Sequence, residues 1–278
     1  MNTTTKVYLD TNVFDHILNK KGGITEKHVL RFQSALQTGQ FLVPVSLLAV
    51  EETLLALESH PETAKKQLKL IQILSDDRFV LKPPGELLEG EIQAFGGSDD
   101  VSPFLGDDSI RNMLQNVVTD PPRPEELDEV ISEVRLQKEQ FREAMREAKK
   151  QVSKDLGNIQ DEPPSFHDYF MKAAPFLAEE YALRAKTSER RQKIAVDKLL
   201  EIRSVRLSVG ANLSLAYGQI VEGWSPNLGD GIDMRHVVPA SACEYLISND
   251  KRFRRIVERV PITDFRVFDF ASFVEEYL

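Results

Sequence analysis

Several common features are scarce in this sequence, and each absence excludes something. Cys243 is the only cysteine, so a disulfide framework within the chain is excluded and a reducing, cytoplasmic location is expected. No apolar run approaches the roughly 18 residues that cross a bilayer, and no apolar signal core opens the chain, so no membrane association is expected. With 35 Lys and Arg against 44 Asp and Glu, the net charge is −9, which disfavours a protein that coats nucleic acid through charge alone.

Two kinds of cofactor motif are missing as well. The five histidines show no paired spacing typical of a zinc site, and the sequence has no glycine-rich phosphate loop of either nucleotide-binding kind. A haloacid-type phosphatase also begins with an Asp at a strand end, but it needs a second Asp two residues later, where Asn12 stands. His236 follows Asp233 by three residues; packing in the core or at its rim is the favoured role, and an approach to phosphate is the other.

Apolar periodicity predicts an α/β protein whose sheet is built from both ends of the chain. Short apolar strands alternate with helical patterns near the N-terminus, and the same alternation returns near the C-terminus, as in a parallel α/β sheet. The predicted strands are 6–10, 41–45, 78–82, 244–248 and 265–270, and the predicted helices are 25–37, 62–74, 233–243 and 251–259. Residues 1–85 and 210–278 are therefore expected to form one discontinuous domain.

Residues 86–209 read as a helical insertion. A heptad seam runs along its first arm and is broken once, at Lys138, where an apolar residue would be expected; its members are Leu127, Ile131, Val134, Phe141, Met145, Ala148 and Val152. A second apolar stripe follows the break at 157–164, through Leu177, Tyr181, Ala195, Leu199, Ile202 and Val209. The two stripes predict an antiparallel helical hairpin over about 124–209.

Four acidic residues stand at predicted strand ends or in the helices that follow them: Asp10, Glu52, Asp233 and Asp250. Parallel strands bring such positions to one edge of the sheet. Four carboxylates together would repel one another unless divalent cations neutralised them, and hard cations such as Mg²⁺ or Mn²⁺ prefer oxygen ligands. Such a centre suits hydrolysis at phosphorus, because the ions lower the pKa of a bound water and stabilise the leaving oxygen.

Three segments resemble the PIN-domain nucleases: VYLDTNVFDHIL (7–18), VPVSLLAVEETL (43–54) and GIDMRHVVPASACEYLISNDKRF (231–253). The resemblance covers the two ends of the chain and not residues 86–209. It implies a three-layer α/β/α fold with a central parallel sheet, and a metal-dependent endoribonuclease site. Carried over by position, it makes Asp10, Glu52, Asp233 and Asp250 the catalytic, metal-binding acids, with Asn12 and Ser248 as their hydrogen-bonding partners.

Two positions remain open. Glu51 stands beside Glu52; the resemblance implies a spacing of six residues from Ser46 to the acid, which favours Glu52. Pro239 lies inside the helix that Asp233 should open, which leaves Asp230 as a competitor for the third acid. Asp233 is preferred because His236, Ala240 and Cys243 fall on its helical face.

The expected substrate is RNA, single-stranded rather than double-stranded, although the residues do not distinguish RNA from DNA. Residues 184–206 are locally basic, and Arg190, Arg191 and Lys193 would grip a phosphate backbone there; Lys251 and Arg252 are a second candidate set. A solvated helix face or a homodimer through the heptad seam would also account for the insertion. The competing function is a catalytically inert PIN-like module that binds nucleic acid or a protein, and no residue indicates an antitoxin-like partner.

Overall fold

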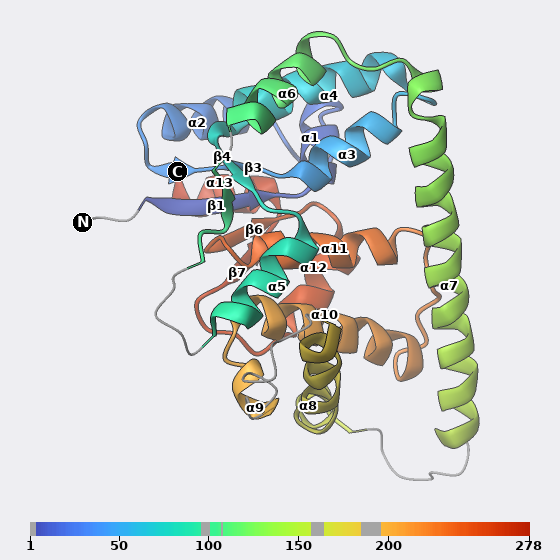
Figure 1. The fold of residues 1–278 in the computed structure, drawn as a ribbon. Coiled ribbons are helices and arrows are strands. Elements are labelled where there is room, and N and C mark those ends of the chain that lie inside the picture. Colours follow the sequence, from blue (N-terminus) through green and yellow to red (C-terminus); the bar gives the residue numbers. More distant parts are fainter. Residues whose placement is uncertain (1–3, 96–100, 107, 157–163, 185–195) are drawn as a thin grey trace.

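The computed structural model describes residues 4–95, 101–106, 108–156, 164–184 and 196–278 (Figure 1). Its strands are β1 (Thr5–Leu9), β2 (Phe41–Leu42), β3 (Pro44–Val45), β4 (Asp76–Leu81), β5 (Phe104–Leu105), β6 (Tyr245–Ile247) and β7 (Arg266–Phe268). Its helices are α1 (Thr11–Leu18), α2 (Glu26–Gln37), α3 (Leu47–Leu55), α4 (Pro61–Leu74), α5 (Pro84–Ala94), α6 (Asp108–Thr119), α7 (Asp128–Leu156), α8 (Phe166–Arg184), α9 (Val196–Leu199), α10 (Arg203–Ile220), α11 (Asp230–Ala240), α12 (Lys251–Glu258) and α13 (Phe270–Tyr277), with a 3₁₀ turn at Pro124–Glu126.

The central sheet joins the two ends of the chain, as predicted. Its strand order is β2-β1-β6-β7, and all its neighbours are parallel. β1 near the N-terminus pairs with β6 near the C-terminus, with Val7 opposite Tyr245 and Leu9 opposite Ile247. The carboxyl ends of β1 and β6 therefore lie side by side, and this edge carries Asp10 and Ser248.

The apolar run 41–45 does not form one strand, contrary to expectation. It divides at Val43 into β2 and β3, which belong to different sheets. β3 pairs in parallel with β4, and β4 pairs in antiparallel with β5, a short strand that the periodicity did not predict. Pro44 accounts for the division in physical terms, because proline has no N–H to continue a hydrogen-bonded ladder.

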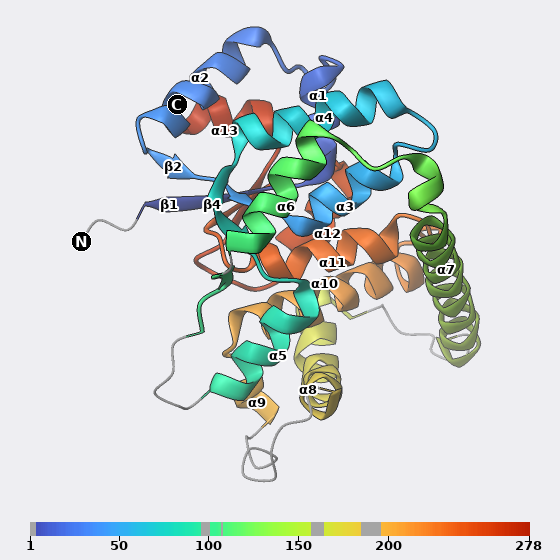
Figure 2. The same ribbon diagram turned by 45° about the horizontal axis from the view of Figure 1, so that its top comes forward.

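Helices cover both faces of the central sheet (Figures 1 and 2). The alternation of side chains along β1 sets this arrangement: Val7 and Leu9 enter a core formed with α1, α2, α4 and α13, whereas Tyr8 enters a core formed with α10, α11 and α12. The molecule is thus an α/β protein with a parallel four-stranded sheet. Within the described residues, no helix combines the length and the apolar character that a bilayer crossing would need.

The helices of residues 86–209 pack differently from the predicted hairpin. α7 contacts α10 and α11, α8 contacts α10, and α7 and α8 do not run alongside each other (Figure 1). Part of the heptad seam of α7 therefore packs against apolar groups of α10 and α11. Phe141, for example, packs directly against Gly231 of α11. α10 runs continuously across position 210, so the predicted domain boundary falls inside a helix.

Candidate metal centre

Asp10 lies at the point where β1 ends and α1 begins. Its backbone is extended, and its side chain caps the helix by accepting a hydrogen bond from the Thr11 N–H at 2.7 Å. Its own N–H donates to the Ile247 carbonyl of β6 at 3.0 Å, which extends the pairing of the two strands by one residue. Asp10 is 3% exposed, so the sheet edge holds a buried carboxylate.

Asn12 and Ser248 hold one oxygen of this carboxylate. The Ser248 hydroxyl donates to Asp10 Oδ2 at 2.7 Å, and the Asn12 side-chain amide donates to the same oxygen and to Ser248 Oγ. The Asn249 N–H donates to Asn12 Oδ1 at 2.7 Å, which fixes the orientation of the amide. Both residues that the resemblance gives as hydrogen-bonding partners therefore contact Asp10 directly.

The adjacent residues Glu51 and Glu52 point in different directions from α3, which starts at the Ser46 cap after β3. Glu52 Oε2 lies 3.2 Å from His236 Nε2. Glu51 forms a two-pronged ion pair with Arg235, at 3.0 and 3.2 Å. Of the two neighbouring acids, Glu52 is the one that faces Asp10 and His236.

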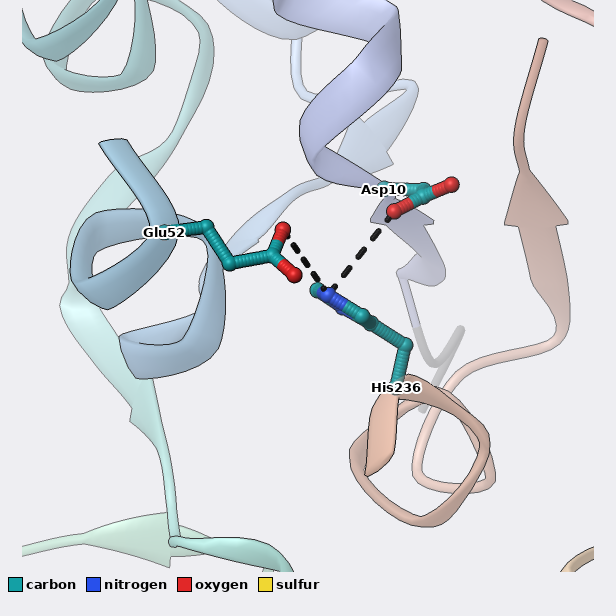
Figure 3. Close-up of side chains that lie close together, drawn as sticks. All are labelled: Asp10, Glu52 and His236. Atoms are coloured by element: carbon teal, nitrogen blue, oxygen red, sulfur yellow. Dashed lines mark ion pairs between the residues drawn. The ribbon is translucent and has the colours of Figure 1, made fainter. Parts of the chain in front are cut away.

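His236 occupies the middle of the site (Figure 3). It is fully buried, as expected for packing, but its Nε2 lies 3.8 Å from Asp10 Oδ1 as well as beside Glu52. On the other side of the ring, Nδ1 is 2.5 Å from the Tyr8 hydroxyl, which is 2.8 Å from Ser46 Oγ. The sequence favours core packing for His236. Its spacing of three residues from Asp233, about one helical turn, is the feature that indicates a position in the site.

The remaining predicted acids lie nearby but outside this compact group. Asp233 is within electrostatic range of Asp10 and Asp250 and of His236. Asp250 caps α12, accepting hydrogen bonds from the N–H groups of Arg252 and Phe253 at 2.7 and 2.9 Å. Asp230 is buried and accepts from the Asn227 N–H at 2.8 Å and from Arg252 at 2.9 Å, so its carboxylate organises the loop before α11.

Burial and mutual charge shift the pKa values in this cluster. Burial raises the pKa of Asp10, and burial together with the charges of Asp10 and Asp250 raises the pKa of Asp233 to about 8. Burial also disfavours the His236 imidazolium, but Glu52, Asp10 and Asp233 outweigh it and raise its pKa to about 9. Burial would raise the pKa of Glu52 as well; His236 outweighs that effect, and this pKa is lowered.

The donor set fits a divalent cation. One ligand atom from each of Asp10, Glu52 and His236 lies within 4.8 Å of the other two. His236 Nε2 is enclosed and makes no well-aligned hydrogen bond among the described residues. Two carboxylates and an imidazole suit Mn²⁺ better than Mg²⁺, because Mg²⁺ takes oxygen ligands almost exclusively. A bound cation would have to replace the proton that the carboxylates favour on His236.

The predicted nucleic-acid contacts are less clearly placed. Arg190, Arg191 and Lys193 lie outside the described residues. Lys251 is exposed on α12, whereas Arg252 donates to Asp230 and to the Ser225 carbonyl and lies over the Trp224 ring at 5.2 Å. Arg252 therefore supports the loop that precedes α11.

Comparisons with protein-family models, with curated proteins and with solved structures gave no match. The functional assignment consequently depends on the geometry of the site and on the motifs in the sequence.

Proposed function

We propose that this protein is a metal-dependent endoribonuclease of the PIN-like class, with a three-layer α/β/α nuclease domain. The observation that carries the proposal is the buried group Asp10, Glu52 and His236 at the carboxyl edge of the parallel sheet, with ligand atoms within 4.8 Å of one another. Ligand sites of open α/β sheets lie at this edge. A cation bound there would supply a water of lowered pKa as the nucleophile for phosphodiester hydrolysis.

The side chains around the proposed cation position have different roles. Asp10, Glu52 and His236 would hold the ion, and Asp233, whose pKa of about 8 reflects burial and neighbouring carboxylates, would become ionised beside it. Ser248 and Asn12 fix Asp10 Oδ2, which leaves Oδ1 on the side of His236. The Tyr8 hydroxyl fixes the imidazole through Nδ1 and leaves Nε2 directed at the carboxylates.

The direct test is cleavage of labelled single-stranded RNA by the purified protein with Mn²⁺ or Mg²⁺. Cleavage should require the added ion, stop with EDTA, and disappear in Asp10→Asn, which keeps the size of the side chain but removes its charge. A parallel reaction with DNA of the same sequence shows whether the 2′-hydroxyl matters. RNA cleavage that persists both in EDTA and in Asp10→Asn would disprove the assignment.

One observation favours the competing function, an inert PIN-like module. His236 stands 3.2 Å from Glu52, and its raised pKa favours the imidazolium form, whose positive charge can neutralise the carboxylates in place of a cation. In such a module the ion pair would be the final arrangement of the site. Calorimetric titration of the folded protein with Mn²⁺ distinguishes the two functions. Mn²⁺ binding supports the nuclease, and no binding at millimolar Mn²⁺ supports the inert module.

A further inference from the structure

The break in the heptad seam of α7 lies beside the metal centre. Lys138 stands where the pattern calls for an apolar residue, between Val134 and Phe141 on the face of α7 that packs against α11. Its side chain is half-buried, and its ammonium group makes no hydrogen bond or ion pair with the described residues. Its positive charge helps to hold the pKa of Glu52 down, after the larger effect of His236.

α7 is fixed against the site by specific contacts. Phe141 packs on Gly231, where an added Cβ would lie 2.9 Å from the aromatic ring. Near the start of the helix, Arg135 forms an ion pair with Glu58, in the loop that follows α3. These contacts hold the part of α7 that carries Lys138 against α11 and against the loop after α3.

A cavity of about 170 Å³ lies between α7 and α11 at this position. Its apolar lining residues are Val134, Phe141 and Ile232, and its polar lining residues are Gln137, Lys138 and Arg235. Arg235 is paired with Glu51, whereas Lys138 forms no ion pair with any residue that the structure describes. The cavity lies near the carboxylate cluster, because its Lys138 is within electrostatic range of Glu52 and its Arg235 precedes His236 on α11.

Resting on the proposed function, we propose that this cavity binds the nucleotide next to the scissile bond of a single-stranded RNA. Lys138 contacts its phosphate, and the apolar lining residues receive the base. Charge complementarity selects this occupant, since an ammonium group that makes no hydrogen bond or ion pair with the described residues lies beside apolar side chains, near the proposed phosphodiester-cleaving centre. An unpaired strand is required because a base held in a duplex cannot enter the cavity.

The experiment compares Lys138→Met with the matched control Lys150→Ala. Met keeps the length of the side chain and restores an apolar residue to the seam, so the variant should fold; Lys150 is exposed on the same helix and paired with Glu147. RNA affinity is measured by fluorescence anisotropy at several salt concentrations, with divalent ions chelated so that no cleavage occurs. Mn²⁺ affinity is measured separately.

Removing one phosphate contact should reduce the slope of log affinity against log salt by about 0.7 and weaken binding about fivefold at 0.1 M salt. Lys150→Ala should keep both the wild-type slope and the wild-type Mn²⁺ affinity. Lys138→Met should bind Mn²⁺ at least as tightly as wild-type protein, because it removes a positive charge near Glu52, so weaker RNA binding cannot result from a lost metal ion. If wild-type protein binds and cleaves RNA but Lys138→Met retains its slope and affinity, the cavity is not the nucleotide site and the proposed function still stands. If wild-type protein neither binds nor cleaves RNA, the proposed function itself fails.

Discussion

The two walls of the candidate metal centre are built in different ways. On the sheet-edge wall, Asp10 is held by Asn12 and Ser248, which follow the ends of two paired strands. On the helical wall, Glu52 and His236 come from α3 and α11, and their mutual ion pair of 3.2 Å holds them together. The first wall depends on the backbone pairing of β1 with β6, whereas the second depends on how two helices pack around the sheet.

Because of this difference, a bound cation should change the contacts of one wall more than those of the other. Asp10 Oδ2 already has hydrogen-bond donors that a metal would leave in place. Glu52 and His236 form an ion pair, and a metal would replace the proton on His236 by a coordinate bond. Changes on the helical wall should therefore have the largest effects on metal binding.

The largest expected effect is that of His236→Gln. Glutamine can still hydrogen-bond to Tyr8, but it supplies no imidazole nitrogen between Asp10 and Glu52. Mn²⁺ affinity should fall by more than about 100-fold, beyond the loss typical of a residue that only supports a ligand, and RNA cleavage should be lost. Calorimetric titration with Mn²⁺ measures the change.

Arg235→Gln is the matched control, because Arg235 is the neighbouring residue and points to Glu51 outside the cluster. It should leave Mn²⁺ affinity unchanged. If His236→Gln instead binds Mn²⁺ more tightly than wild-type protein, His236 is a competing cation and not a ligand, and the helical wall has the opposite role.

The two walls also differed in how far the sequence predicted them. Asp10, Asn12, Glu52 and Ser248 lie in short motifs that the sequence shows directly, and the helix caps at Asp10 and Ser46 are local. The place of His236 depends on how α11 rotates about its axis against the sheet, which long-range packing sets. The predicted hairpin differed from the structure for the same reason, since an apolar seam shows that α7 needs a partner but does not say which.

A smaller effect is expected on the sheet-edge wall, from Ser248→Ala. This change removes the hydroxyl that donates to Asp10 Oδ2 at 2.7 Å and leaves the ligand itself in place. Mn²⁺ affinity should fall about 10- to 100-fold, the range for residues that orient a metal ligand. Ser208→Ala is the control: Ser208 is also buried but its hydroxyl donates to Tyr181, away from the cluster, so this variant should bind Mn²⁺ like wild-type protein.

Proton linkage gives a third test, with a smaller effect at each pH step. On folding, the pKa of His236 rises from 6.5 to about 9 and the pKa of Asp233 rises from 3.8 to about 8. At these two residues the folded protein without metal therefore binds protons more tightly than the unfolded chain. The stability that protonated His236 contributes is fully present below pH 6.5 and is lost as the pH rises through about 9. The contribution of protonated Asp233 is fully present below pH 3.8 and is lost as the pH rises through about 8. The metal-free protein should therefore unfold at a lower temperature at pH 9 than at pH 6.5.

Mn²⁺ should stabilise the protein more at high pH than at low pH, because it replaces the proton of His236 and favours ionised Asp233. Its affinity should rise with pH by up to about tenfold per unit for each proton released. Thermal unfolding with and without Mn²⁺ at pH 6.5 and 8.5 measures both trends, and Asp233→Asn should flatten the pH dependence of the metal-free protein. An Mn²⁺ stabilisation that is equal at both pH values would show that the ion does not displace these protons.

The smallest effect on the centre is expected from Gly231→Ala, which tests the attachment of α7 to the helical wall. The new methyl group would lie 2.9 Å from the Phe141 ring, so α7 must move away from α11, at a cost of about 1–3 kcal/mol in the free energy of unfolding. Gly85→Ala, at the start of α5 with open space around it, should not destabilise the protein. Mn²⁺ affinity should stay within about twofold of the wild-type value, because Asp10, Glu52 and His236 do not rely on Phe141 for their hydrogen bonds and ion pairs. RNA affinity, in contrast, should fall as Lys138 moves with the helix, and a parallel loss of both affinities would show that α7 also supports the metal ligands.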